Sequence, residues 1–241
     1  MCMCRFYAPS SGRIDEAEEL VKNRNAYKYP AVGLAGSIES WTQEDFTSTL
    51  QMDRHHHELL TSLDDASTVF GYLSVVFWGY FSGRDGTDNF GRAESRAKLA
   101  RKAIQGGRAG GVGGASHKIR EARSLLESDQ CGKSLRLLWE LPQLGPAFAS
   151  KVCAFLAPTK CGVVDSVIAR NYPDFAFCAN PKGFVKRLAG NAYSYDSYCS
   201  VLRGTAEELN QMGSEFRWKD RDGSLQTWRA VDVERALFQA R

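Results

Sequence analysis

Apolar residues recur along most of the chain with the three-to-four residue spacing of amphipathic helices. This periodicity predicts helices at 14–23, 42–63, 66–81, 93–105, 117–126, 133–140, 182–190, 194–211 and 232–240, and one that starts near Asp165. Ser40 or Thr42, and Asp232, are the expected caps of two of them. Only residues 216–228, with a turn at Asp222-Gly223, look strand-like. The pattern therefore predicts a mainly α fold.

The glycine-rich stretch QGGRAGGVGG at 105–114 interrupts the helical pattern. Glycine at this density favours a flexible connection, so we predict a hinge or loop between a lobe at 1–110 and a lobe at 111–241. Nucleotide-binding patterns do not fit. GxGxxG lacks its third glycine after Gly111 and Gly113, and Glu127 stands where the phosphate-loop pattern needs its first glycine.

Composition and charge describe an ordinary globular protein. The chain has 241 residues, 43% of them hydrophobic, and a formal net charge of +3 that is compatible with nucleic acid without arguing for it. The apolar run at 69–81 is too short to span a bilayer and predicts a buried core helix, and the N-terminus has no signal-peptide core. The expectation is a cytoplasmic monomer without membrane contact.

The cysteines and histidines suggest no metal site by their spacing. Seven cysteines, an odd number, form neither a disulfide framework nor a paired CxxC zinc pattern, so reduced thiols are expected. His55, His56 and His57 are consecutive, whereas helical ligand pairs need i, i+4 spacing. We predict that they lie on a solvated or half-buried helix face.

The segment LRLLWELPQLGPAFASKVCAFL at 135–156 indicates two helices joined by a short turn. Pro146 suits the first turn of the second helix, and exposed amides at such a hairpin can bind a DNA phosphate. A turn of this kind is also compatible with plain helix packing. The DNA contacts expected from this region are Gln143, Gly145, Ala147, Lys151 and Arg170.

An aspartate follows the hairpin at the start of a new helix, in Val164-Asp165-Ser166-Val167-Ile168-Ala169-Arg170. Together with Leu141-Pro142-Gln143-Leu144-Gly145, it resembles the helix–hairpin–helix DNA glycosylase superfamily, whose signature is an LPGVG hairpin followed by an aspartate in a VDxxxxR context. The nearest members are of the 8-oxoguanine type. The resemblance implies a two-lobed helical fold with a cleft between the lobes, and a double-stranded DNA substrate with a flipped base.

Asp165 is the counterpart of the family's essential aspartate, and the alternative is that it only caps its helix. A carboxylate beside the sugar stabilises the positive charge that builds as the base leaves, and it can orient or deprotonate water. Bifunctional members carry a lysine where this chain has Ala147, so we expect a monofunctional enzyme that leaves an abasic site. Lys151, one helical turn further on, is the alternative nucleophile.

The resemblance also implies features that leave little mark in the sequence. No iron–sulfur cluster is expected, because the cysteines are scattered, but Na⁺ or K⁺ could bind the hairpin through the carbonyls of Trp139, Leu141 and Leu144. The candidate base pocket comprises Trp78, Phe81, Arg84, Asp85 and Trp218, against the alternative that such aromatic residues are core.

Three readings stay open. The first is a monofunctional glycosylase that acts on an oxidised or alkylated base, or on a modified base of foreign DNA. The second is a glycosylase that also cuts the strand through Lys151. The third is a helix–hairpin–helix protein that binds DNA without catalysis. Asp165 distinguishes the enzyme from the binder, because a pure binder does not need it.

Overall fold

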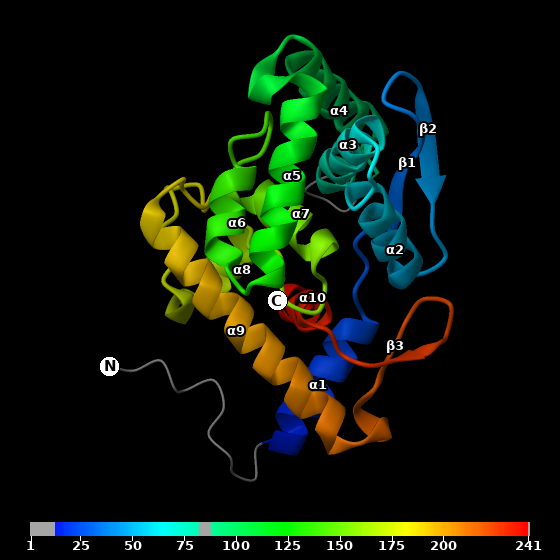
Figure 1. Ribbon diagram of the computed structural model, residues 1–241. Helices are drawn as coiled ribbons and strands as arrows, with labels where there is room; N and C mark the ends of the chain where they lie inside the picture. Colours follow the sequence, from blue (N-terminus) through cyan, green and yellow to red (C-terminus); the bar gives the residue numbers. More distant parts are fainter. Residues whose placement is uncertain (1–12, 82–87, 241) are drawn as a thin grey trace.

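The structure is a computed structural model that describes residues 13–81 and 88–240. It is mainly helical, as predicted (Figure 1). The helices are α1 (Arg13–Asn25), α2 (Thr49–Leu60), α3 (Asp65–Phe81), α4 (Phe90–Gln105), α5 (Gly111–Glu127), α6 (Cys131–Leu138), α7 (Pro146–Leu156), α8 (Ser166–Asn171), α9 (Ala189–Met212) and α10 (Ala230–Gln239). The strands are β1 (Val32–Gly36), β2 (Trp41–Asp45), β3 (Trp218–Lys219) and β4 (Leu225–Gln226).

Helix α3 is the centre of the core. Every residue from Thr68 to Trp78 is buried, which fits a helix that is apolar on all sides. It contacts α2, α4, α5, α7 and β1. The prediction that the run at 69–81 is a buried core helix is thus confirmed. Within the described ranges, no helix is both long enough and apolar enough to cross a membrane.

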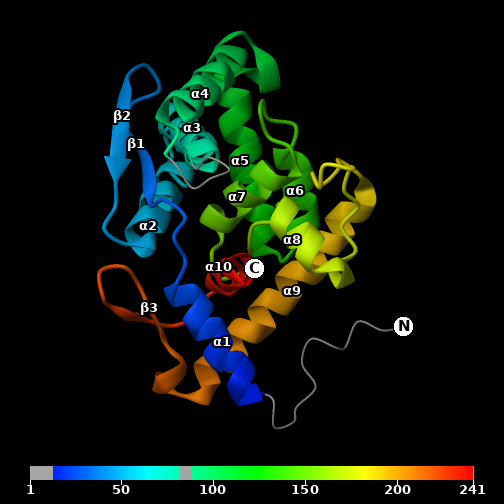
Figure 2. The ribbon, with the colours of Figure 1, turned by 180° about the vertical axis from the view of Figure 1, so that it is seen from behind.

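The first and last helices of the chain pack together on the other side of the molecule. Helix α1 contacts α10, which in turn contacts α9 (Figures 1 and 2). A buried ion-pair network fastens these helices to α2. Arg24 of α1 and Arg229 bind Asp232 at 3.0 and 2.7 Å, and Arg229 and Arg235 bind Asp53 of α2 at 2.6 and 2.5 Å. The prediction that Asp232 caps its helix is therefore wrong, because its carboxylate belongs to this network.

The helix predicted at 42–63 is wrong in its first part. Residues 41–45 form β2, which pairs antiparallel with β1 from Val32–Asp45 to Gly36–Trp41. The helix begins only at Thr49, where the Ser48 side chain accepts a hydrogen bond from the backbone of Gln51. Neither Ser40 nor Thr42 is a cap, because they lie in the turn and in β2. The strand-like segment at 216–228 is confirmed as the β3–β4 hairpin.

Two further segments differ from the prediction. Residues 182–188 are not helical, because the Asn180 side chain accepts hydrogen bonds from the amides of Lys182 and Phe184, and Gly183 has a φ of +84°. Helix α9 starts only at Ala189. The glycine-rich stretch is not a loop throughout, because α5 already begins at Gly111. The division into two lobes near residue 110 stays a prediction.

Candidate functional site

The α6–α7 turn holds its backbone in an unusual conformation. Leu141 and Leu144 are buried beneath it, Pro146 is the first residue of α7, and Gln143 has a φ of +61°. This left-handed conformation favours glycine, which explains why the family signature has glycine where this chain has Gln143. Arg96 of α4 donates a hydrogen bond to the Gln143 side chain at 3.4 Å.

Helix α7 places the side chain of Lys151 in the protein interior. The side chain is only 7% exposed, and its Nζ atom lies 4.9 Å from the centre of the Trp78 ring, with Tyr29 and Phe148 at 5.9 and 5.8 Å. Gly79 makes this approach possible, because a Cβ there would lie 3.1 Å from Lys151 Cδ and 2.4 Å from Phe148. The Lys151 amine is therefore buried among aromatic rings, which stabilise its protonated form by cation–π interaction.

The loop at 161–165 brings Asp165 to the same place. Three side chains fix its backbone: Tyr195 and Tyr198 of α9 donate to the carbonyls of Gly162 and Val163, and the Ser150 hydroxyl of α7 accepts from the amide of Val164 at 2.9 Å. Asp165 then caps α8, since its Oδ1 atom accepts from the amides of Val167 and Ile168.

One small cavity joins these residues. It is lined by Lys151, Asp165, Glu234 and the apolar or aromatic side chains Tyr27, Tyr29, Trp78, Val163 and Phe238. Its volume is about 20 Å³, enough for one water molecule, whereas ligand pockets usually enclose about 300 Å³ or more. A nucleobase can enter only after some of these side chains move aside.

Burial sets the charges around this cavity. It lowers the pKa of Lys151, which the nearby Asp165 and Glu234 oppose. It raises the pKa of Glu234 to about 8, with a further contribution from repulsion by Asp165. Glu234 therefore keeps its proton near neutral pH. A buried amine with a lowered pKa is the form of lysine that acts as a nucleophile.

Of the predicted base-pocket residues that the structure describes, one lines this cavity and two do not. Trp78 lines the cavity with Lys151 and Asp165. Phe81 and Trp218 do not line it: Phe81 packs against Phe77 in the core, and Trp218 lies buried under the Arg24 guanidinium. The base-pocket role of these residues stays a prediction. Arg84 and Asp85 lie outside the described residues.

The predicted DNA contacts have different surroundings. Gln143, Gly145 and Ala147 are partly exposed at the hairpin, and Arg170 is exposed on α8, where a backbone phosphate could reach them. Lys151 is buried, so its contact would be with a flipped nucleotide rather than with a phosphate on the surface. These roles stay predictions.

An arginine that the sequence reasoning missed lies at the hairpin. Arg187 donates a hydrogen bond to the carbonyl of Leu144 at 2.5 Å, so this carbonyl of the predicted cation site already has a cationic partner. The Leu141 carbonyl accepts from the Leu144 amide. The Na⁺ or K⁺ site at Trp139, Leu141 and Leu144 stays a prediction. No motif marks Arg187, which lies more than forty residues downstream on an irregular loop.

The rings of His55, His56 and His57 all form hydrogen bonds with other groups of the protein. His55 and His57 are half-buried as predicted, but His56 is fully buried between the Met52 carbonyl and the Ser74 hydroxyl, and burial lowers its pKa to about 4. The ring nitrogens of His55 and His57 pair with the carbonyls of Leu34 and Phe155. The three histidine rings therefore contribute to internal packing and hydrogen bonding.

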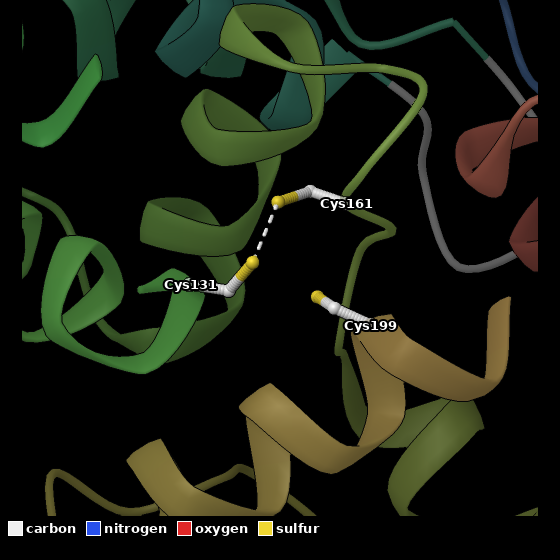
Figure 3. A group of neighbouring side chains, drawn as sticks. All are labelled: Cys131, Cys161 and Cys199. Carbon is white, nitrogen blue, oxygen red and sulfur yellow. Dashed lines mark hydrogen bonds between the residues drawn. The ribbon is translucent and has the colours of Figure 1, made fainter. Parts of the chain in front are cut away.

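Glu234 and a cysteine cluster are the other features that the sequence did not reveal. Cys131 begins α6, Cys161 lies in the loop before Asp165, and Cys199 lies in α9. Their sulfur atoms point toward one another and all lie within 4.8 Å, with 3.7 Å between Cys131 and Cys161 (Figure 3). In the sequence they are thirty residues or more apart, so their spacing contains no metal-binding pattern.

Comparison with known families gives a match over most of the chain. A family profile described as "Putative 8-oxoguanine DNA glycosylase OGG-like protein" matches residues 37–238, which include Lys151, Asp165 and Glu234. No curated protein and no solved structure gives a significant match. Because the matched segment is well over half of the chain, this mainly helical protein belongs to the OGG-like glycosylase family.

Proposed function

We propose that this protein is a DNA glycosylase for a damaged base, with Lys151 as its nucleophile and Asp165 as its essential carboxylate. The observation that carries the proposal is that a buried lysine with a lowered pKa lines the same cavity as the aspartate of the glycosylase motif. A buried cation without a function costs stability, and perturbed ionisable groups gather at active sites.

The chemistry follows from these two groups. The neutral Lys151 amine bonds to C1′ of the flipped nucleotide while the C1′–N bond to the base breaks. The amine loses one proton, and the leaving base gains one. The Asp165 carboxylate stabilises the positive charge that develops on the sugar. The resulting N,O-acetal opens when its C1′–O4′ bond breaks and O4′ takes a proton, which leaves a protonated imine between Lys151 and C1′. This imine loses a C2′ proton as the C3′–O bond breaks, so the 3′-phosphate leaves and the strand is cut.

The family description makes 8-oxoguanine the first substrate to test. The aromatic side chains Tyr29, Trp78 and Phe238 around the cavity suit a planar base, since rings of this kind stack on bases. Oxidised or alkylated bases other than 8-oxoguanine, and modified bases of foreign DNA, complete the panel. An enzyme that repairs the cell's own DNA should prefer the oxidised or alkylated bases of this panel. An enzyme of defence should prefer the modified bases of foreign DNA.

The test uses the full chain and duplex DNA with 8-oxoguanine opposite cytosine. Wild type should release the base, nick the strand without alkali, and be trapped on DNA by borohydride. Lys151→Ala should lose the adduct and the nick. Asp165→Asn should slow base release by about 100-fold or more and leave DNA binding largely intact. Lys133→Ala, which removes an exposed lysine of α6, is the matched control and should behave like wild type.

The monofunctional alternative rests on Ala147, which occupies the usual lysine position. It predicts base release that persists in Lys151→Ala, no borohydride adduct, and strand breakage only after alkali. That result would retain the glycosylase and replace the lysine by water that Asp165 activates. DNA binding with no base release across the whole panel would leave only the non-catalytic binder.

A further inference from the structure

Three thiols from distant parts of the chain converge in the protein interior. Cys131 is 1% exposed and Cys161 and Cys199 are fully buried, and they come from α6, the loop before Asp165, and α9. Single buried cysteines are common as small apolar core residues. Three whose sulfur atoms point toward one another and lie within 4.8 Å are a different arrangement, because their ligand atoms are close enough to share one ion (Figure 3).

We propose that Cys131, Cys161 and Cys199 bind a single divalent ion of the zinc class as thiolates. Soft sulfur ligands select such ions, and zinc binds thiolates tetrahedrally at about 2.3 Å, which separates neighbouring sulfur atoms by about 3.8 Å. The distance between the sulfur atoms of Cys131 and Cys161 is 3.7 Å. This is far longer than a disulfide bond, which is about 2.05 Å. A disulfide would also leave the third thiol without a role.

The charges around the cluster suit this ion. Three thiolates and a divalent ion carry one net negative charge, which burial penalises unless it is balanced. Cys131 is the first residue of α6, where the helix dipole favours a thiolate. Lys160, next to Cys161, and Arg203, one turn after Cys199, both bind Asp129, at 3.0 and 2.5 Å. Asp196 adds a second carboxylate beside Cys131, where it accepts from the Gly132 amide at 2.6 Å, and Lys133 of α6 lies close enough to offset it. Three cations and two carboxylates therefore leave one positive charge to balance the cluster.

The proposed ion has a structural part in the glycosylase site. Cys161 lies four residues before Asp165 on the loop that Tyr195, Tyr198 and Ser150 also hold. A metal there would tie α6 and α9 to this loop and so position the carboxylate. Among the described His, Cys, Asp and Glu residues, no fourth member joins the cluster. The fourth coordination position therefore belongs to an exogenous ligand such as water.

The test measures bound metal directly, so it does not depend on glycosylase activity. Full-length protein, purified with reductant and dialysed without chelator, should contain about one equivalent of zinc by mass spectrometry. After zinc removal, Co²⁺ should produce thiolate-to-cobalt charge-transfer bands and the intense visible bands of tetrahedral cobalt. Cys199→Ser and Cys161→Ser should lose the zinc and the cobalt spectrum.

The matched controls are Cys153→Ser, which alters a buried thiol outside the cluster, and Cys178→Ser, which alters an exposed one; both should retain one equivalent. The double variant Cys2→Ser/Cys4→Ser removes the N-terminal thiols and should also retain it. Wild type that takes up neither zinc nor cobalt would overturn the proposal, and this result needs no variant to fold. So would a Cys131–Cys161 disulfide in the native protein, or zinc that persists in folded Cys199→Ser.

Discussion

Single residues set the chemistry of the site through burial. Lys151 and Glu234 would be unremarkable on the surface, but in the cavity the pKa of Lys151 falls and the pKa of Glu234 rises to about 8. Both shifts disfavour charge, as burial dictates. With Glu234 protonated, Asp165 is the carboxylate that remains beside the Lys151 amine.

Glu234→Gln should make stability less dependent on pH. An unfolded glutamate loses its proton near pH 4.3 or so, whereas folded Glu234 keeps it up to about pH 8. Between these values the native state binds more protons, so wild-type stability falls as the pH rises, by up to about 1.4 kcal/mol per pH unit. The glutamine variant lacks this loss, so its advantage in unfolding free energy should grow with pH across that range.

Urea unfolding of both proteins at several pH values between about 5 and 8 measures this advantage. Glu207→Gln, an exposed position on α9, is the control and should follow the wild-type curve. Parallel curves for wild type and Glu234→Gln would mean that Glu234 is ionised in the folded protein, contrary to the prediction.

The site residues differ in how far the sequence could reveal them. Asp165 carries a motif, and Lys151 could be placed one helical turn beyond Ala147, but the burial that changes its chemistry depends on Gly79 of α3 and is not visible locally. Glu234 has a weak signal, since it is one of three charged residues inside the short apolar stretch AVDVERALF. A charged residue on a buried helix face indicates a partner or a function.

Among the elements, the loop between α7 and α8 has the most direct effect on function. It has no regular structure, and side chains of two neighbouring helices hold it where Asp165 must point. Of the three side chains that bind this loop, Ser150 is the nearest to Asp165 in the sequence, and it lies on α7 next to Lys151. The same helix thus supplies the proposed nucleophile and positions its partner.

Ser150→Ala should reduce both stability and base release. It removes the hydroxyl that accepts the hydrogen bond of the buried Val164 amide, and an unsatisfied buried amide costs about 1–3 kcal/mol. Loosening of the loop should also lower the rate of base release more than it weakens DNA binding. Thermal unfolding and single-turnover assays measure the two effects.

Ser134→Ala is the matched control for Ser150→Ala. Ser134 is equally buried, but its hydroxyl pairs with the Cys153 thiol, a weak hydrogen-bond partner, so its loss should cost less stability and leave base release unchanged. Equal losses of activity in the two variants would show that the effect comes from general loosening of the core and not from the loop.

Sequence periodicity found most helices and failed where short-range polar contacts decide the structure. The β1–β2 hairpin was missed because β2, WTQED, is polar and only half-buried, so it has no apolar alternation. The irregular path at 182–188 depends on Asn180, whose side chain replaces helical hydrogen bonds. Both errors leave the site intact, since neither segment lines the cavity.

Across the whole molecule, the cavity beside Asp165 depends on contacts between the first and last helices of the chain. Tyr27 and Tyr29 follow α1, Glu234 and Phe238 belong to α10, and the rest of the lining comes from the middle of the sequence. The network of Arg24, Asp53, Arg229, Asp232 and Arg235 holds α1 and α10 against α2. Arg235 is next to Glu234, so the network also sets the position of the helix that closes the cavity.

Asp53→Asn should destabilise the protein strongly at neutral pH and much less in acid. Burial opposes the charge of Asp53, but Arg235 and Arg229 outweigh it and lower its pKa. Its contribution is therefore complete above the unfolded pKa of about 3.9 and is lost as the pH falls further. Removing one partner of a buried ion pair costs about 3–5 kcal/mol, because the remaining arginines lose their counter-charge.

Chemical unfolding at neutral pH and at a pH of about 2, well below the unfolded pKa, separates this electrostatic loss from a packing defect, which would be the same at both. Glu127→Gln, which removes the exposed partner of Arg123 in α5, should change stability far less at either pH. Because α10 carries Glu234, Asp53→Asn should also slow base release although Asp53 does not line the cavity. If Asp53→Asn unfolds like wild type at neutral pH, the network does not hold the two ends of the chain together, and the cavity must owe its shape to apolar packing alone.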